Sequence, residues 1–242
     1  MTILLMGTVC LAGCSCKVSD QIDVLLQQAK SRGPDRVSTD HRGKVVRVSF
    51  KDMAVTDADV EAIGQLGHLE DLDISGTEIS DQALEHLKKL QSLKYLHVAD
   101  TSVTDEGLEN LENMPNLTVL ILSSTGVTGK GLRHLASLPN LEVLELWKNA
   151  ITDAGLAHLR PLDKLRHLYL VETKVTDAGL QHLQSLASLK RLYLGNTDVT
   201  DVGLKHLESL KNLTYLYLAD TRVTADGVEE LKRALPALQV EM

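Results

Sequence analysis

Apolar and polar residues follow a 24-residue period along most of this chain. Each unit begins at a leucine-type position, and no insertion or deletion separates one unit from the next. These first positions are Val45, Leu69, Leu93, Leu117, Leu141, Leu165, Leu189 and Leu213. A unit this short cannot enclose a hydrophobic core by itself, so the strict period predicts stacked units that bury their apolar faces against one another, which is a solenoid.

Within a unit, two kinds of apolar spacing follow one another. In one unit, Leu192 and Leu194 flank Tyr193, which is the alternation of a short strand with one face toward a core. Leucines then recur at every third residue from Leu204 to Leu210, as on one apolar stripe of a short helix. Because every unit has the same connection, successive strands are predicted to be parallel, forming one curved sheet of eight strands with helices outside.

The units share the pattern LxxLxLxxTxVTDxGLxHLxxLxx. In this pattern the chain resembles leucine-rich-repeat proteins of the bacterial kind, with 24-residue units and a VTDxGL helix start. The resemblance covers residues 45–242. It implies an α/β solenoid of eight repeats that binds another molecule, without enzyme activity and without a cofactor. The sequence also contains no phosphate-binding loop, nucleophile elbow or HExxH helix.

Three polar positions recur with the leucines and are expected to belong to the fold. Position nine carries Thr77, Thr101, Thr125, Asn149, Thr173, Thr197 and Thr221. The family usually has Asn or Cys there, bonded to the backbone of neighbouring turns, and Thr is expected to do part of that job. Helix N-caps are expected at Ser80, Thr104, Thr152, Thr176 and Thr200. The Asp after each cap suits the positive helix start, and a cation site is the alternative.

Glycine recurs at one position near the start of most of the predicted repeat helices. Glycine is a poor helix former, so its recurrence predicts close backbone approach between neighbouring units. The residues concerned are Gly107, Gly131, Gly155, Gly179, Gly203 and Gly227.

Strand positions three, five and seven of each unit are predicted to project from the inner, concave face. All five tyrosines and the single tryptophan fall on these positions, although aromatic residues make up only 3% of the chain. Tyr and Trp are frequent at binding surfaces because a flat apolar ring ends in a polar group. The predicted ligand-binding residues are Tyr95, Trp147, His167, Tyr169, Arg191, Tyr193, Tyr215 and Tyr217.

The expected partner of this face is an unidentified protein or peptide. A glycan stacked on the same rings is one alternative, and a passive spacer whose tyrosines only stabilise the sheet is another. Acidic residues in earlier units, such as Asp71, Asp73 and Glu145, would give the partner an acidic end and an aromatic, basic end. With a net charge of −8 and no long basic run in the repeats, nucleic acid is not an expected partner.

The first residues indicate a location. Residues 2–13 are apolar but fewer than the roughly 20 that a spanning helix needs. They look like a bacterial lipoprotein signal, residues 1–13, cleaved before Cys14 and lipidated there, although the first basic residue is only Lys17. We therefore expect a cell-envelope protein, anchored to the membrane by lipid or secreted. The alternative is an apolar leader without lipid.

Cysteine and histidine have smaller expected roles. All three cysteines, Cys10, Cys14 and Cys16, precede the repeats, so no disulfide is expected to brace the fold and no metal site is predicted. A histidine row on neighbouring helices is predicted to make a repeated structural contact, because shared metal ligation would need ring nitrogens much closer than helices 8–10 Å apart provide. Its members are His86, His134, His158, His182 and His206. Sensitivity to pH or a metal site is the alternative. Asn116 and Asn212 each begin an NLT sequon.

Both ends of the solenoid are expected to be covered. Residues 14–44 would cover the N-terminal end of the solenoid, with a helix over 19–32 whose N-cap is Ser19 and a hairpin strand before the first repeat. The eight repeats occupy 45–236, and residues 237–242 would supply a capping strand.

Overall fold

The computed structural model describes residues 15–242. The predicted signal, residues 1–13, and the predicted lipidation at Cys14 lie outside the described residues. The strands are β1 Val37–Thr39, β2 Val45–Ser49, β3 Asp71–Asp73, β4 Tyr95–His97, β5 Val119–Ile121, β6 Val143–Glu145, β7 His167–Tyr169, β8 Arg191–Tyr193, β9 Tyr215–Tyr217 and β10 Gln239–Glu241.

The helices are short in the repeats and longer at the two ends. The α-helices are α1 Ser15–Arg32, α2 Asp57–Ile63, α3 Asp81–Leu87, α4 Leu132–Leu135, α5 Asp153–Leu156, α6 Asp177–Leu180, α7 Asp201–Leu204 and α8 Ala225–Ala234. The 3₁₀ helices are η1 Pro34–Arg36, η2 Gly107–Leu111, η3 Ala157–Leu159, η4 Gln181–Leu183 and η5 Lys205–Leu207. No helix in residues 15–242 is long and apolar enough to span a bilayer.

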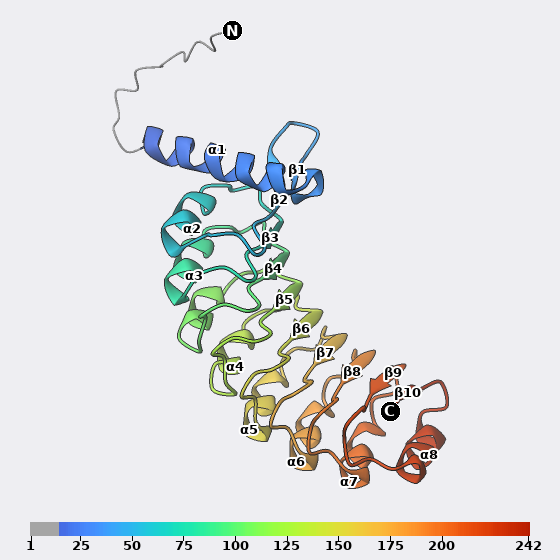
Figure 1. The fold of residues 1–242 in the computed structure, drawn as a ribbon. Coiled ribbons are helices and arrows are strands. Elements are labelled where there is room, and N and C mark those ends of the chain that lie inside the picture. Colours follow the sequence, from blue (N-terminus) through green and yellow to red (C-terminus); the bar gives the residue numbers. More distant parts are fainter. Residues whose placement is uncertain (1–14) are drawn as a thin grey trace.

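One sheet runs through the whole solenoid, with its strands in sequence order from β1 to β10. Strand β1 pairs with β2 antiparallel, and every later pair is parallel, with residues 24 apart as register partners. Figure 1 shows the strands on the inner side of an arc and the helices on its outer side. The predicted α/β solenoid is therefore confirmed. The sheet has ten strands, because β1 and β10 extend the eight repeat strands at both ends.

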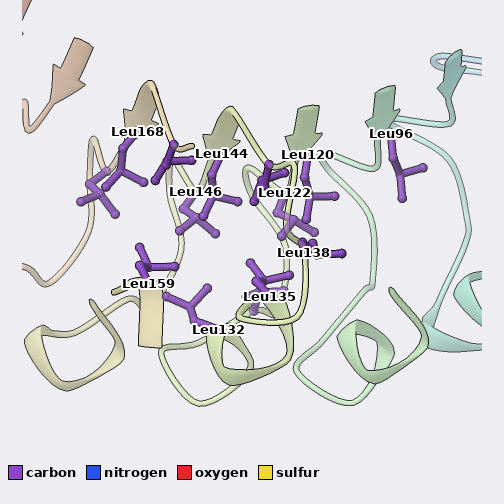
Figure 2. Packing of buried hydrophobic residues seen from close by; sticks show 14 of the residues in the cluster. Leu96, Leu120, Leu122, Leu132, Leu135, Leu138, Leu144, Leu146, Leu159 and Leu168 are labelled. Atoms are coloured by element: carbon purple, nitrogen blue, oxygen red, sulfur yellow. The ribbon is translucent and has the colours of Figure 1, made fainter. Parts of the chain in front are cut away.

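The core lies between the sheet and the helices. The central strand leucines, from Leu72 to Leu216, have no exposed surface, and Phe50 is equally buried. Figure 2 shows Leu120 and Leu144 of successive strands above Leu135 of α4. Burying each such side chain stabilises the fold by roughly 1.5–3 kcal/mol. The leucine period therefore fixes which strand positions must face away from the core.

Helix boundaries differ from the predicted ones in two places. Ser19 lies inside α1, which already includes Ser15, so Ser19 is not its N-cap. Leu210 lies beyond η5, which ends at Leu207, yet it remains buried in the turn that follows. Each repeat closes its helix early because the chain must return to the sheet within 24 residues.

The aspartate after each cap joins one repeat to the next. Asp177 Oδ1 accepts a hydrogen bond from the backbone N–H of Thr200 at 2.7 Å, and Asp177 Oδ2 accepts from Thr200 Oγ1 at 2.6 Å. The same pair of bonds joins Asp57 to Ser80, Asp81 to Thr104, Asp105 to Thr128, Asp153 to Thr176, and Asp201 to Thr224. We call this series the Asp–Thr ladder. Its bonds are charge-assisted, which strengthens them.

The recurring glycines make room for this ladder. A Cβ on Gly203 would lie 2.4 Å from Asp177 Oδ1, and Gly107, Gly131, Gly179 and Gly227 are similarly placed. The predicted close approach is confirmed, but in these five repeats the nearest group is a carboxylate. Gly155 alone among the six has backbone as its nearest neighbour, since a Cβ there would lie 2.4 Å from the Cα of Gly129. Gly129 stands where the ladder needs Asp, so the ladder is interrupted there.

Two other predicted polar roles need correction. Threonines at position nine bond within their own turn: Thr197 Oγ1 donates to the Leu194 carbonyl oxygen at 2.5 Å, three residues earlier. Among the position-nine side chains of residues 15–242, only Asn149 donates to the backbone of a neighbouring repeat, at 2.8 Å from the Leu122 carbonyl oxygen, while its Oδ1 accepts from Thr125 Oγ1 at 3.1 Å. The threonine side chain is too short to do so. Thr104 does not occupy the N-cap of η2, which begins at Gly107 with Glu106 as its N-cap, although the Thr104 hydroxyl accepts from the Glu106 backbone N–H at 3.3 Å.

Candidate ligand-binding face

The concave face is built by the residues that alternate with the buried strand leucines. On β8, Leu192 is fully buried between Arg191 and Tyr193, which project from the sheet. Seven of the eight predicted site residues occupy projecting strand positions of this kind, and Trp147 lies two residues after β6. Tyr95 and Trp147 are the most exposed aromatic side chains, at 41% and 42%.

Five of these residues form one cluster, which we call the aromatic cluster: Trp147, Tyr169, Tyr193, Tyr215 and Tyr217. The rings of Tyr169 and Tyr193 stack with their centroids 4.2 Å apart and their planes at 11°. Tyr193 also packs against Tyr215 at 5.3 Å and Tyr217 at 6.1 Å, with tilted planes. Parallel register on β7, β8 and β9 places these rings side by side. Stacked and tilted contacts between aromatic rings add to the stability of the cluster.

Trp147 follows β6 and is held by the turns beside it. Its Nε1 donates to Glu172 Oε1 at 3.1 Å, and Lys148 Nζ lies 5.0 Å from the ring centroid. Lys148 and Glu172 both have left-handed backbones, with φ of 57° and 54°. The recurring left-handed turn after each strand thus carries the two charged groups that orient the indole.

A hollow of about 300 Å³ lies within the aromatic cluster. We call it the aromatic hollow, and it is lined by Glu145, Trp147, Tyr169, Val171, Tyr193 and Tyr217. Gly195 contributes to its shape, because a Cβ there would lie 2.4 Å from Cε1 of Tyr217. Without a side chain at this position, the Tyr217 ring can lie over the preceding repeat and close one side of the hollow.

A second hollow of about 320 Å³ lies on the other side of Trp147 and is polar. We call it the polar hollow; its lining includes Asp73, His97, Asp100, Glu145, Trp147 and Lys148. Glu145 and Trp147 line both hollows and so mark their boundary. The concave face therefore changes from polar and charged to aromatic at β6, in the order that the sequence predicted.

The remaining predicted site residues lie at different distances from the cluster. His167 and Arg191 are register partners on β7 and β8, next to the tyrosines. Burial lowers the pKa of His167, and the positive charges of Arg191, Lys190 and Arg166 lower that pKa further. Tyr95 is not brought to the cluster. It projects from β4, and two intervening strands carry valine at the same position.

Two tyrosines are weaker acids than an ordinary tyrosine, for different reasons. Burial, together with the neighbouring Tyr193, raises the pKa of Tyr169 to about 12. A hydrogen bond from the Tyr215 hydroxyl to the Glu241 carboxylate raises the pKa of Tyr215 to about 12. Both rings are therefore neutral hydrogen-bonding groups at physiological pH. Glu241, on the capping strand β10, was not among the predicted site residues, since its place beside Tyr215 depends on strand pairing.

The acidic end of the face is partly neutralised. Asp71 on β3 pairs with Arg47 on β2, with Oδ2 and Nε 3.1 Å apart. Burial nevertheless raises the pKa of Asp71, because the cost of removing its charge from water outweighs the attraction to Arg47. Asp73 accepts a hydrogen bond from Ser49 Oγ at 3.0 Å.

The histidine row lies on the outer side of the arc and makes contacts between repeats. His134 Nδ1 lies 2.6 Å from Glu112 Oε1, and His182 Nδ1 lies 2.6 Å from Arg160 Nη2. His206 Nδ1 is 3.2 Å from Gln184 Nε2. These three histidines therefore make the predicted structural contact, each with a residue 22 positions earlier. Within residues 15–242, no three His, Cys, Asp or Glu side chains gather as metal ligands would.

The sequon asparagines also connect repeats, a role that sequence reasoning missed. Asn116 Nδ2 donates to the Gln91 carbonyl oxygen at 2.9 Å, and Asn212 Nδ2 donates to the Ala187 carbonyl oxygen at 2.8 Å. Asn140 stands at the same repeat position and makes the same bond to Pro115. Recurrence of Asn at this one position was the signal in the sequence.

Comparisons with known proteins agree with this architecture. The family model described as "Leucine-rich repeat region" matches residues 56–240. The solved structure of internalin C2 from Listeria monocytogenes is similar, with a TM-score of 0.66 and 21% identity, covering 91% of this chain and 92% of that one. A search of curated proteins returned no match.

Two structures of complexes are similar over part of their length. One is PEPR1–AtPEP1, with a TM-score of 0.56, 16% identity and coverage of 93% of this chain and 41% of that one. The other is the plant peptide hormone receptor RGFR1 in complex with RGF2, with a TM-score of 0.54, 15% identity and coverage of 86% and 36%. At these identities the likeness concerns the fold alone.

Proposed function

This chain belongs to the leucine-rich-repeat family, and we propose that it is a non-catalytic module of the bacterial cell envelope that binds a protein or peptide on its concave face. The observation that carries this proposal is the aromatic cluster. Four tyrosines and the single tryptophan gather on one part of the concave face, and three of these tyrosines line a hollow of about 300 Å³ together with the tryptophan. Packing of the core does not require this, because the leucines on the opposite strand face already fill it.

The size of the face indicates how a partner would bind. Eight repeat strands spaced about 4.8 Å apart make a wall roughly 35 Å long and near 500 Å² in area. A standard protein interface buries about 800 Å² per partner. An extended peptide segment therefore fits the wall itself, whereas a folded partner would also contact the turns after the strands. Two similar folds were solved as PEPR1–AtPEP1 and as the peptide hormone receptor RGFR1 in complex with RGF2, which supports a binding role for the fold.

The proposed location rests on the apolar run before Cys14. We propose that the chain is attached to the membrane through lipid on Cys14, or is secreted if the leader is removed without lipid. Mass spectrometry of the mature N-terminus from native cells measures this directly. An N-terminal Cys14 with the mass of a diacylglyceryl group is expected; an unmodified Cys14 would rule out the lipid anchor.

A pair of tyrosine variants tests the binding proposal. Tyr193 lies at the centre of the aromatic cluster, and Tyr95 is the matched control because it projects from the same sheet away from the cluster. In cross-linking to envelope proteins from native cells, we expect Tyr193→Ala to weaken capture of one partner by more than about tenfold, as for a central aromatic anchor. Tyr95→Ala should have little effect.

Two results would count against this function. If Tyr193→Ala folds normally and captures every partner as well as the unaltered protein does, the cluster serves only the stability of the sheet. If a glycan array instead gives binding that is lost in Tyr193→Ala, the ligand is a carbohydrate stacked on the same rings. Circular dichroism and thermal unfolding of both variants establish that they are folded.

A further inference from the structure

We infer that the ligand places a basic side chain, lysine or arginine, in the aromatic hollow, between the Tyr169 ring and the Glu145 carboxylate. This inference rests on the proposed function and specifies the chemistry of the partner. An organic cation is attracted both by the negative face of an aromatic ring and by a carboxylate. The aromatic hollow presents these two kinds of group together.

One ring face in the hollow is free of other rings on the side toward Glu145. Tyr169 stacks on Tyr193 of β8 at 4.2 Å, which covers one face of its ring. The opposite face is turned toward β6, where the register partner of Tyr169 is Glu145. A cation between the two would therefore contact a π face on one side and a carboxylate on the other.

The charge of Glu145 is not neutralised by a neighbouring cation. Its Oε1 accepts a hydrogen bond from the neutral Ser123 hydroxyl at 2.7 Å. Throughout the described residues, no Lys, Arg or His nitrogen lies within ion-pair distance of Glu145. Basic groups nearby do not fill the hollow either, since Arg191 and His167 are not part of its lining. A basic side chain from the partner would supply the counter-charge.

Trp147 already attracts a cation on the polar side. Lys148 Nζ lies 5.0 Å from its ring centroid, yet Lys148 lines the polar hollow and not the aromatic hollow. The protein's own lysine therefore leaves the aromatic hollow open. The volume of about 300 Å³ is at the lower end of ligand pockets, which suits one side chain and not a whole peptide. The inferred contact is thus a single basic anchor.

A direct test uses small blocked amino acids and the fluorescence of Trp147, the only tryptophan of the chain. N-acetyl-lysine amide and N-acetyl-arginine amide are titrated into the protein, with N-acetyl-norleucine amide as the uncharged analogue of similar length. We expect a saturable change in fluorescence with both cations. Their dissociation constants should be at least about fivefold lower than that of the norleucine compound, because cation–π and carboxylate attraction act together. Equal responses to all three compounds would overturn the inference.

Charge variants separate the contact from general electrostatics. Glu145→Gln should weaken binding of the lysine compound about two- to fivefold, since the carboxylate contributes part of the attraction. Glu109→Gln is the matched control, because it removes the same charge from an exposed position in η2. Equal weakening in both variants, or none in Glu145→Gln, would contradict the inference. Thermal unfolding shows that both variants retain the fold.

A displayed random-peptide library distinguishes failure of this inference from failure of the proposed function. Peptides are selected on the unaltered protein and depleted on Tyr193→Ala. Enrichment of lysine or arginine, reduced on Glu145→Gln, is the expected result. Peptides that depend on Tyr193 but carry no basic residue would overturn the inference and leave the proposed function standing. Absence of any peptide that depends on Tyr193 would overturn both.

Discussion

In each repeat, the turn at the helix start and the concave face follow the same 24-residue period. They differ in how strictly the residue types recur from one repeat to the next. At the turn, Asp, Thr and Gly recur because each repeat is bonded there to its neighbour, as Asp177 is to Thr200. On the wall, the projecting positions change from Asp71 to Val143 to Arg191 without any change in backbone. Contacts between repeats constrain the residue types at the turn. The residue types on the concave face are free to vary, so this face can serve recognition.

Removing one carboxylate from the Asp–Thr ladder should have the largest effect on stability. In Asp177→Ala, the backbone N–H and the hydroxyl of Thr200 both lose a charged acceptor. We expect a loss of about 2–4 kcal/mol in the free energy of unfolding. Urea denaturation followed by circular dichroism measures it.

Asp198→Ala is the control for this change. Asp198 forms an exposed ion pair with Arg222, with the two groups 2.7 Å apart and the carboxylate side chain 64% exposed. Loss of this ion pair should lower the free energy of unfolding by no more than about 0.5 kcal/mol. Equal costs for the two aspartates would show that the ladder is no stronger than an ordinary surface contact.

Filling the space beside a carboxylate of the Asp–Thr ladder should have a somewhat smaller effect on stability. A Cβ on Gly203 would lie 2.4 Å from Asp177 Oδ1, so Gly203→Ala should destabilise the fold by about 1–3 kcal/mol despite the better helix propensity of alanine. Gly67→Ala is the comparison, because no atom lies within 4 Å of its Cβ position, and it should be neutral or slightly stabilising. Thermal unfolding of both variants measures the difference.

A double variant sharpens this prediction. If the clash is with the carboxylate, Gly203→Ala should cost clearly less in the Asp177→Ala background than alone, since the two changes share one contact. Strictly additive costs would assign the glycine a different role.

The interruption at Gly129 should appear as a local change in dynamics. Thr176 and Thr200 donate their backbone N–H to a ladder aspartate, whereas no acceptor for the N–H of Thr152 is found in the part of the chain that the structure describes. We expect the Thr152 amide to exchange with solvent at least about tenfold faster than the other two. Hydrogen exchange followed by NMR gives the three rates. Equal protection at Thr152 would mean that the ladder does not control opening of the turn.

The smallest expected effect concerns the ionisation of Tyr215 on the concave face. A pKa of about 12 for Tyr215, above its ordinary value of 10.0, favours the folded state below pH 10, and this contribution is lost as pH rises from 10 to 12. Glu241→Gln should lower the pKa of Tyr215 toward 10.0 and leave that of Tyr169, which burial raises, near 12. Tyrosinate absorbance at alkaline pH, with Tyr215→Phe for assignment, measures this. A shift in both tyrosines would contradict the separate causes.

Individual residues show which features could be predicted from the sequence and which could not. Phe50 was expected in the core and Tyr193 on the wall, and both are placed so, because alternation along a strand assigns faces directly. Asp177 was expected to serve its own helix, but its carboxylate also reaches Thr200, 23 residues later. Helix-start rules describe only local geometry, so they cannot show a bond across the gap between repeats.

The sequence by itself determined the solenoid, the parallel order of its strands and the face on which the aromatic residues lie, because each of these follows from local periodicity. Only the tertiary structure decided which of those residues meet. Curvature and ring packing bring Tyr169, Tyr193 and Tyr217 around one hollow with Trp147, and leave Tyr95 apart on β4. Glu145 stands at the edge of that hollow because strand register places it beside Tyr169. Contacts between repeats depend on the spacing and tilt of whole units, which no single unit encodes.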